Sequence, residues 1–283
     1  MNVNIKNPKV SVVMPAFNMQ EHISEAIDSV RRQNFEDWEL IVVDDCSTDS
    51  TPDIVHRYVT MDPRVRSTRT NKNTNLPGAA RNIGIAMATG SYIAFLDHDD
   101  IWRSIKLERQ LKVFSLDDSV DLVHSHLLGL HESPFVRFTT LSNPFRRRAN
   151  KSTLSERNMI QCSSVMVKSS TLRHHGGFSK DQELRAVEDY DLWFRIASGG
   201  KAVFVSEIHG HYRMTGSGTL ANTRLSEKLK SFDERNETHS ARYQRGKIKR
   251  IVAGIFAFPV AIYIYFIDGE FRIRAGIYPR IWT

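Results

Sequence analysis

Residues 92–100, with the sequence YIAFLDHDD, constrain the fold of this chain more than any other stretch. Residues 92–96 are mostly apolar and predict a short buried strand, and three carboxylates follow within the next four positions. Open α/β sheets bind ligands beyond the carboxyl ends of their strands, where these acids would lie. Carboxylates this close repel one another unless one is protonated or a cation lies between them. The run therefore indicates either a site where Mg²⁺ or Mn²⁺ bridges carboxylates to phosphates, or an acidic helix start.

Strands and helices alternate over roughly the first 100 residues, which predicts a single doubly wound, mostly parallel α/β sheet. The spacing of apolar residues predicts strands at 9–14, 38–43, 65–68 and 92–96, and helices at 21–30, after Ser50 or Thr51, and at 78–87. In such a sheet the strand ends bring Phe17, Asp45 and residues 97–100 to one edge. This convergence is the first indication of a binding site.

The second half of the chain shows a more mixed pattern. A helix is expected at 107–114, strands at 121–124 and 162–167, and a helix start at 188–195 with acids in its first turn. Residues 135–155 are polar and basic, and we expect them to form a loop over the site.

Cysteine usage and charge bear on compartment and partners. Cys46 and Cys162 are the only cysteines, too few for a disulfide framework, and residues 1–7 lack the apolar run of a signal peptide, so a reducing cytosol is expected. The formal net charge is +7, of which +6 falls from Arg224 onward. An electrostatic partner is therefore expected at the C-terminal tail.

The tail combines a basic and an apolar segment. Residues 242–250 are strongly basic, and the 17 residues 251–267 contain no charged side chain and many aromatic ones. Pro259 would kink a helix near the middle of this run. The pattern is typical of an interfacial anchor on an anionic membrane, and an amphipathic hairpin packed on protein is the alternative.

Five short motifs, taken together in this order and spacing, resemble family 2 of the inverting nucleotide-sugar glycosyltransferases. They are Pro15-Ala16-Phe17, Val43-Asp44-Asp45, Gly78-Ala79-Ala80-Arg81-Asn82, Asp97-His98-Asp99-Asp100 and Glu188-Asp189. The resemblance covers residues 9 to 215. It implies the A-type glycosyltransferase fold and an Asp-x-Asp metal motif.

The resemblance assigns roles around the nucleotide donor. It implies that Asp45 accepts a hydrogen bond from the imide N–H of a pyrimidine, and that Asp44 holds the loop. Asp97 is expected to hold the ribose or a metal-bound water, and Asp99 to bind Mn²⁺ or Mg²⁺ across the diphosphate. Other groups expected to line the donor are Pro15, Ala16, Phe17, Arg81 and Arg213.

The reaction also requires a base. Diphosphate departure is helped by a Lewis acid, and the attacking hydroxyl must lose a proton to a carboxylate or histidine. By resemblance the base is Asp189, with Glu188 binding the acceptor and His211 as an extra metal ligand. Glu188 and Asp189 could instead only compensate the dipole of their helix.

The sequence thus predicts a catalytic domain at 1–222, with a nucleotide-binding half at 9–102 and an acceptor half at 103–222, and a membrane-associating tail at 223–283. The expected enzyme moves one sugar from a nucleoside-diphosphate sugar, most simply UDP-linked, to a saccharide or lipid-linked saccharide at the inner face of the cytoplasmic membrane. One alternative is sugar nucleotidyltransfer, although residues 15–19 lack a glycine-rich basic loop. Another is a non-enzymatic membrane-surface module. No nucleic-acid partner is expected, because the basic residues abut an apolar run.

Overall fold

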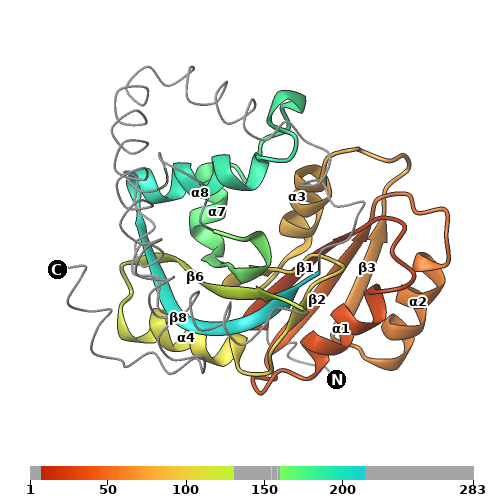
Figure 1. The fold of residues 1–283 in the computed structure, drawn as a ribbon, viewed down its shortest axis with the longest axis horizontal. Coiled ribbons are helices and arrows are strands. Elements are labelled where there is room, and N and C mark those ends of the chain that lie inside the picture. Colours follow the sequence, from red (N-terminus) through yellow and green to blue (C-terminus); the bar gives the residue numbers. More distant parts are fainter. Residues whose placement is uncertain (1–7, 131–153, 155–157, 159, 214–283) are drawn as a thin grey trace, which may run out of the picture. The chain divides into compact units, whose positions relative to one another are not determined.

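A computed structural model describes residues 8–130, 154, 158 and 160–213 (Figure 1). The predicted tail at 223–283, with its apolar run at 251–267, lies outside these residues, as does the predicted loop at 135–155 apart from Leu154. Within the described ranges, no helix is long and apolar enough to cross a bilayer.

The elements follow one another in the order that the sequence predicts for the first half, and continue into a mixed second half. They are β1 (Val10–Ala16), α1 (Ile23–Arg31), β2 (Trp38–Asp44), α2 (Thr51–Met61), β3 (Val65–Arg69), α3 (Pro77–Met87), β4 (Tyr92–Phe95), β5 (Ile101–Trp102), α4 (Lys106–Leu116), β6 (Val120–Gly129), the 3-10 turn η2 (Cys162–Ser164), β7 (Met166–Lys168), α7 (Ser169–His175), the 3-10 turn η3 (Gln182–Leu184), α8 (Glu188–Gly199) and β8 (Lys201–Tyr212).

All the described strands belong to one sheet with the order β3-β2-β1-β4-β7-β6-β8-β5. The pairs β1–β2, β1–β4, β2–β3 and β6–β8 are parallel. The pairs β4–β7, β6–β7 and β5–β8 are antiparallel. The predicted doubly wound, mostly parallel sheet is confirmed, and β7 is the antiparallel strand that joins its two halves.

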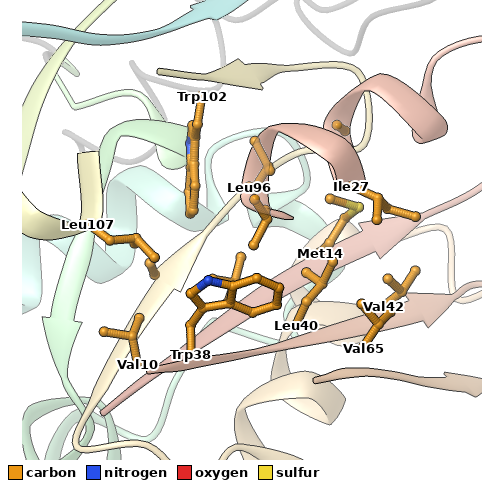
Figure 2. Packing of buried hydrophobic residues seen from close by; sticks show 14 of the residues in the cluster. Val10, Met14, Ile27, Trp38, Leu40, Val42, Val65, Leu96, Trp102 and Leu107 are labelled. Atoms are coloured by element: carbon orange, nitrogen blue, oxygen red, sulfur yellow. The ribbon is translucent and has the colours of Figure 1, made fainter. Parts of the chain in front are cut away.

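The central strands are buried on both faces because helices cover both. Every residue of β1 and β2 is buried, as their near-continuous apolar sequences predict. On one face, β1 and β2 pack against α1, α2 and α4, and Figure 2 shows Met14, Ile27 and Trp38 in this cluster. On the other face α3 approaches closely: a Cβ at Gly84 would lie 2.4 Å from Cγ1 of Val13.

The face that α3 covers continues under α8 through aromatic side chains. The ring centroid of Phe95, at the end of β4, lies 5.2 Å from that of Phe178 and 5.8 Å from that of Trp193 in α8. These contacts are buried and contribute about 0.5–1.5 kcal/mol per pair beyond the area they bury. They tie the middle of α8 to the end of β4, where the acidic residues follow.

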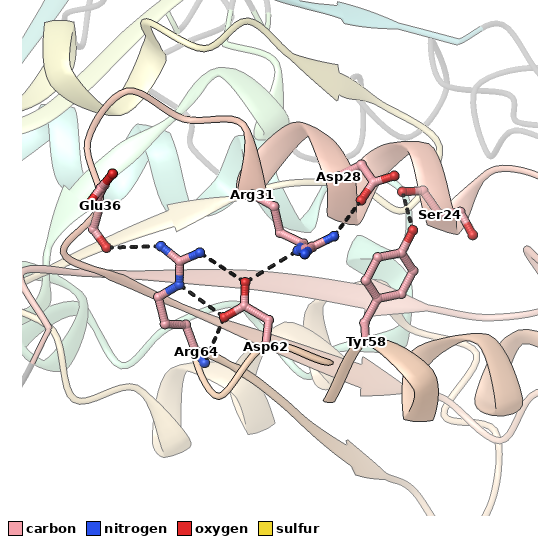
Figure 3. Close-up of polar contacts among 7 residues, drawn as sticks. All are labelled: Ser24, Asp28, Arg31, Glu36, Tyr58, Asp62 and Arg64. Carbon is pink, nitrogen blue, oxygen red and sulfur yellow. Dashed lines mark hydrogen bonds and ion pairs between the residues drawn. The ribbon is translucent and has the colours of Figure 1, made fainter. Parts of the chain in front are cut away.

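A polar cluster joins α1 to the turn before β3 (Figure 3). Asp62 is buried, and its carboxylate accepts hydrogen bonds from Arg64 (Nε 3.0 Å, Nη2 2.9 Å) and from Arg31 (Nε 3.3 Å). Chiefly because of the Arg64 hydrogen bond, the pKa of Asp62 falls to about 2. A carboxyl group whose pKa is lowered by folding stabilises the folded state at pH values above its ordinary pKa. This contribution is lost as the pH falls toward 2.

We expect Asp62→Asn to lower the free energy of unfolding by about 1–2 kcal/mol at pH 7. One pKa unit corresponds to about 1.4 kcal/mol, and the partly exposed arginines reduce the effect through solvent screening. Urea denaturation at pH 7 and at pH 3 checks this, because the difference from wild type shrinks as Asp62 protonates. Asp28→Asn, which removes the half-buried partner of Arg31 within α1, is the control and is expected to cost less than about 0.5 kcal/mol. A difference that grows on acidification would contradict the prediction.

Candidate active site

The carboxyl ends of β1, β2 and β4 meet at one edge of the sheet. Ala16 of β1 lies opposite Asp44 of β2, and its carbonyl accepts the Asp45 N–H at 2.7 Å. The Nδ1 atom of His98, just beyond β4, lies 2.9 Å from the carbonyl oxygen of Pro15. The sequence prediction that these motifs converge is therefore correct for the three strand ends.

Asp44 is buried and holds the loop that follows β2, as expected. Its Oδ1 accepts the Ser47 N–H at 3.1 Å, and its Oδ2 lies 3.2 Å from Nε of Arg69. The same loop reaches the end of β1, where the hydroxyl of Ser47 accepts the N–H of Asn18 at 2.9 Å. Phe17 stands beside this contact with 40% of its surface exposed, one of few large apolar side chains in the described ranges that face solvent.

The Asp45 carboxylate is held by two threonines that sequence reasoning did not single out. The Thr70 hydroxyl donates to Oδ1 at 2.9 Å, and the Thr74 hydroxyl donates to Oδ2 at 2.8 Å. The Thr74 N–H lies 3.1 and 3.0 Å from the two oxygens. The position of Thr70 carried a usable signal, because it directly follows β3, the parallel neighbour of β2.

The acidic run 97–100 does not begin a helix. It leads into β5, and the next helix, α4, starts only at Lys106, so the helix-start interpretation of the acids is wrong. Burial and the neighbouring carboxylates raise the pKa of Asp100 well above its ordinary value, and burial chiefly raises that of Asp99. A bound cation would offset the repulsion between these crowded carboxyl groups and so favour their ionised form.

Arg213, the residue that follows β8, lies against this acidic run. Its N–H donates to Oδ1 of Asp100 at 3.2 Å, and its Nε lies 3.4 Å from the carbonyl oxygen of Asp99. Its Nη2 contacts Glu25 of α1 at 2.7 Å, on an exposed surface. His211 sits two residues earlier on β8, opposite Ile101, which follows the acidic run.

Arg81 joins the acidic run to the start of α8. Its side chain is buried, with Nη2 2.6 Å from Asp97 Oδ1 and Nη1 3.5 Å from Glu188 Oε1. The prediction that Arg81 lines a base stays a prediction, since the contacts observed are with these two carboxylates and with the ring of Phe178. Gly78 permits this packing, because a Cβ there would lie 2.9 Å from Cγ of Glu188.

Glu188 and Asp189 lie in the first turn of α8, as predicted, but they face different surroundings. Glu188 is only 3% exposed, and its Oε2 accepts no hydrogen bond from the described residues. Asp189 is half-buried and accepts the N–H of Tyr190. Desolvation first and the Glu188 charge second raise the pKa of Asp189 to about 7, while Arg81 opposes the shift. A carboxyl group with this pKa can gain or lose a proton at neutral pH.

The residues present fit a divalent cation only if a ligand completes its coordination. Carboxylate oxygens suit Mg²⁺ and Mn²⁺. In the ranges that the structure describes, however, no three His, Cys, Asp or Glu side chains are grouped to hold a metal. Mg²⁺ sites commonly use one or two carboxylates and take the remaining ligands from phosphates and water. The acidic run fits this second type of site.

Comparison with solved structures identifies the fold. The fold is that of the A-type glycosyltransferases: superposition on Staphylococcus aureus TarS (residues 1–349) in complex with UDP-GlcNAc gives a TM-score of 0.61 at 20% identity, covering 76% of this chain and 61% of that chain. The Pyrobaculum calidifontis mannosyltransferase PcManGT, in complex with GDP-Man and Mn²⁺, also gives 0.61 at 18% identity, over 93% and 82% of the two chains.

Sequence comparison gives the family. The profile described as Glycosyl transferase family 2 matches residues 11–175, and this chain belongs to that family. It is a glycosyltransferase. The putative teichuronic acid biosynthesis glycosyltransferase TuaG of Bacillus subtilis is 31% identical over 219 residues, covering 76% of this chain and 82% of TuaG. The Escherichia coli enzyme WfgD, a UDP-Glc:alpha-D-GlcNAc-diphosphoundecaprenol beta-1,3-glucosyltransferase, is 30% identical over 227 residues, covering 79% and 84%.

Proposed function

We propose that this glycosyltransferase moves one sugar, with inversion, from a UDP-linked donor to a lipid-linked saccharide. The observation that carries the proposal is the half-buried Asp189, with a pKa of about 7, joined through Glu188 and Arg81 to the acidic run at Asp97. The names of the relatives support the substrate class, because WfgD uses UDP-glucose and a diphosphoundecaprenol-linked acceptor. Sugar nucleotidyltransfer and a non-enzymatic module are set aside, since the chain belongs to a glycosyltransferase family.

In the donor half, Asp45 receives the imide N–H of the base while Phe17, with Pro15 and Ala16, lines it. A carboxylate offers about four acceptor positions, and the two threonines already use most of those of Asp45. The Thr74 hydroxyl also lies 3.1 Å from the Leu76 carbonyl oxygen. Its single proton can therefore turn to Leu76, which leaves Oδ2 of Asp45 to accept from the base.

The diphosphate lies over the acidic run, with Asp97 toward the ribose and Asp99 as the protein ligand of Mn²⁺ or Mg²⁺. His211, on β8, and Arg213, the residue after β8, border this position. When bound, the divalent ion supplies Lewis-acid stabilisation of the leaving diphosphate. Arg213 can exchange its exposed partner Glu25 for a phosphate oxygen, since exposed ion pairs contribute only about 0–1 kcal/mol.

In the acceptor half, Asp189 takes the proton of the attacking hydroxyl. One base and one attack on the anomeric carbon give inversion. The Oε2 of Glu188 is buried and unused, and a movement of this side chain toward Asp189 would let it accept a hydrogen bond from a second hydroxyl of the acceptor. The acceptor half at 103–222 and a membrane-associating tail at 223–283, at the inner face of the cytoplasmic membrane, belong to the same proposal.

Thermal unfolding with UDP, dTDP and GDP, each with and without Mn²⁺, tests the donor. A ligand that binds only the native state stabilises it by about 2.7 kcal/mol at 100 times its Kd. We expect UDP with Mn²⁺ to raise the midpoint most, with a smaller rise when EDTA replaces Mn²⁺. A folded protein whose midpoint none of the three nucleotides raises would contradict the proposed donor.

A further inference from the structure

A serine outside all the predicted motifs contacts both ends of the acidic run. Ser163 lies in η2, is 1% exposed, and accepts the Asp97 N–H on its hydroxyl oxygen at 2.9 Å. Its carbonyl oxygen accepts the indole N–H of Trp102 at 2.7 Å. Ser163 therefore contacts the acidic run 97–100 at its first residue, Asp97, and contacts Trp102 two residues after its end.

The Ser163 hydroxyl also acts on Asp100: it lowers the pKa of that carboxyl group, against the burial and the neighbouring charges that raise it. A hydroxyl group has one donor and two acceptor positions, so Ser163 can accept from Asp97 and donate to Asp100 at the same time. Both of these contacts depend on the hydroxyl. The contact with Trp102 uses the backbone carbonyl, and any residue at position 163 would keep it.

Surrounding hydrogen bonds hold the 3-10 turn in place. The Val165 N–H donates to the Cys162 carbonyl at 3.1 Å, and the Phe95 N–H, at the end of β4, donates to the Val165 carbonyl at 3.4 Å. On the other side, the Gln110 side chain donates to the Ser164 carbonyl at 2.7 Å. The Ser163 hydroxyl therefore has a defined position relative to the strand that precedes the acids.

We propose that Ser163 is a positioning residue that sets the acidic run for the donor diphosphate and its divalent cation. The inference rests on the proposed function, because it requires that Asp97 and Asp99 bind the donor. Without the hydroxyl, the Asp97 amide loses its acceptor and Asp100 loses the stabilisation that Ser163 gives its charge, while the Arg213 N–H still donates to Asp100. The Asp99 carboxylate would then no longer be held where a phosphate-bound cation needs it.

Ser163→Ala tests this through Mn²⁺ affinity in the presence of saturating UDP, measured by electron paramagnetic resonance of free Mn²⁺. Loss of a residue that orients a metal ligand weakens affinity by about 10–100-fold, and we expect a loss in this range. The KM for Mn²⁺ should rise by a similar factor, while kcat at saturating Mn²⁺ and donor changes less than about threefold.

Ser164→Ala is the matched control. Ser164 lies in the same turn and is fully buried, but among the residues that the structure describes its hydroxyl bonds only the Gln161 carbonyl, at 2.7 Å. The Ser164→Ala variant should bind Mn²⁺ with the affinity of wild type, even if the substitution lowers the stability of the fold. If Ser163→Ala does not fold, Ser163→Cys, which keeps the volume and weakens the hydrogen bonds, should show a smaller loss of affinity in the same direction.

The inference would be overturned if the folded variant at position 163 bound Mn²⁺ with wild-type affinity, or if Ser164→Ala lost as much Mn²⁺ affinity as that variant. Either result would leave the proposed donor site standing. A wild-type protein that binds no nucleoside diphosphate with Mn²⁺ would overturn the proposed function and this inference together. The two failures are therefore distinguishable from the wild-type titration alone.

Discussion

Replacing Asp189 with Asn is expected to lower kcat by about 10²–10⁴-fold, the usual contribution of a positioned general base. The amide has nearly the same shape and accepts the Tyr190 N–H as before, but it cannot take a proton. Folding should not suffer, because burial and Glu188 already disfavour the Asp189 charge. Steady-state transfer assays with a UDP-sugar donor measure the effect, and the KM for the donor should stay within about threefold.

Asp191→Asn is the matched control for this variant. Asp191 is another acid in the first turn of α8, and it pairs with Arg195 at 2.8 Å rather than with the Arg81 network. If the acids of α8 served only to compensate the helix dipole, both variants would behave alike. A normal kcat in Asp191→Asn beside a large loss in Asp189→Asn separates the two explanations, and equal effects would contradict a catalytic Asp189.

The pH dependence of the wild-type enzyme follows from the same residue. The pKa of Asp189 is raised to about 7, so the base is largely protonated at pH 6 and largely ionised at pH 8. The rate of transfer should therefore rise with pH through neutrality and level off above it. Asp189→Asn should lose this dependence.

Replacing Asp99 with Ala is expected to weaken Mn²⁺ binding in the presence of UDP by more than about 100-fold, since loss of an outer-shell partner alone costs about 10–100-fold. The crowding of Asp99 with its neighbouring carboxylates is relieved in the variant, so its thermal midpoint without ligand should not fall. Electron paramagnetic resonance of free Mn²⁺ measures the affinity. The exposed Asp118, paired with Lys168, gives the control Asp118→Ala, which should bind Mn²⁺ normally.

The first half of the fold could be predicted because each strand there is locally distinctive. β1 and β2 are continuous apolar runs, and the residues between them have clear helical spacing. The second half gave weaker signals. The predicted strand at 162–167 begins as a 3-10 turn and is extended only from Met166. β8 is not predicted, because its only apolar run, residues 202–205, is short and half-buried. β5, with two residues, is too short to show any periodicity.

The site could be predicted as far as strand order allows. Adjacent parallel strands bring Ala16, Asp44 and the acids after β4 together, and this follows from the sequence pattern. The contact of Arg81 with Glu188 joins residues 107 positions apart, and the Ser163 contact with Asp97 joins residues 66 apart. No local propensity encodes such pairs, because they depend on how α8 and η2 pack against β4.

Calorimetric titration of UDP with Mn²⁺ into wild type, Asp189→Asn and Asp99→Ala separates donor binding from proton transfer. Because donor binding is proposed at the acidic run and proton transfer at the start of α8, wild type and Asp189→Asn should bind UDP with similar affinity, while Asp99→Ala loses the Mn²⁺-dependent part. Equal loss of UDP binding in both variants, or no binding to folded wild-type protein, would contradict this assignment.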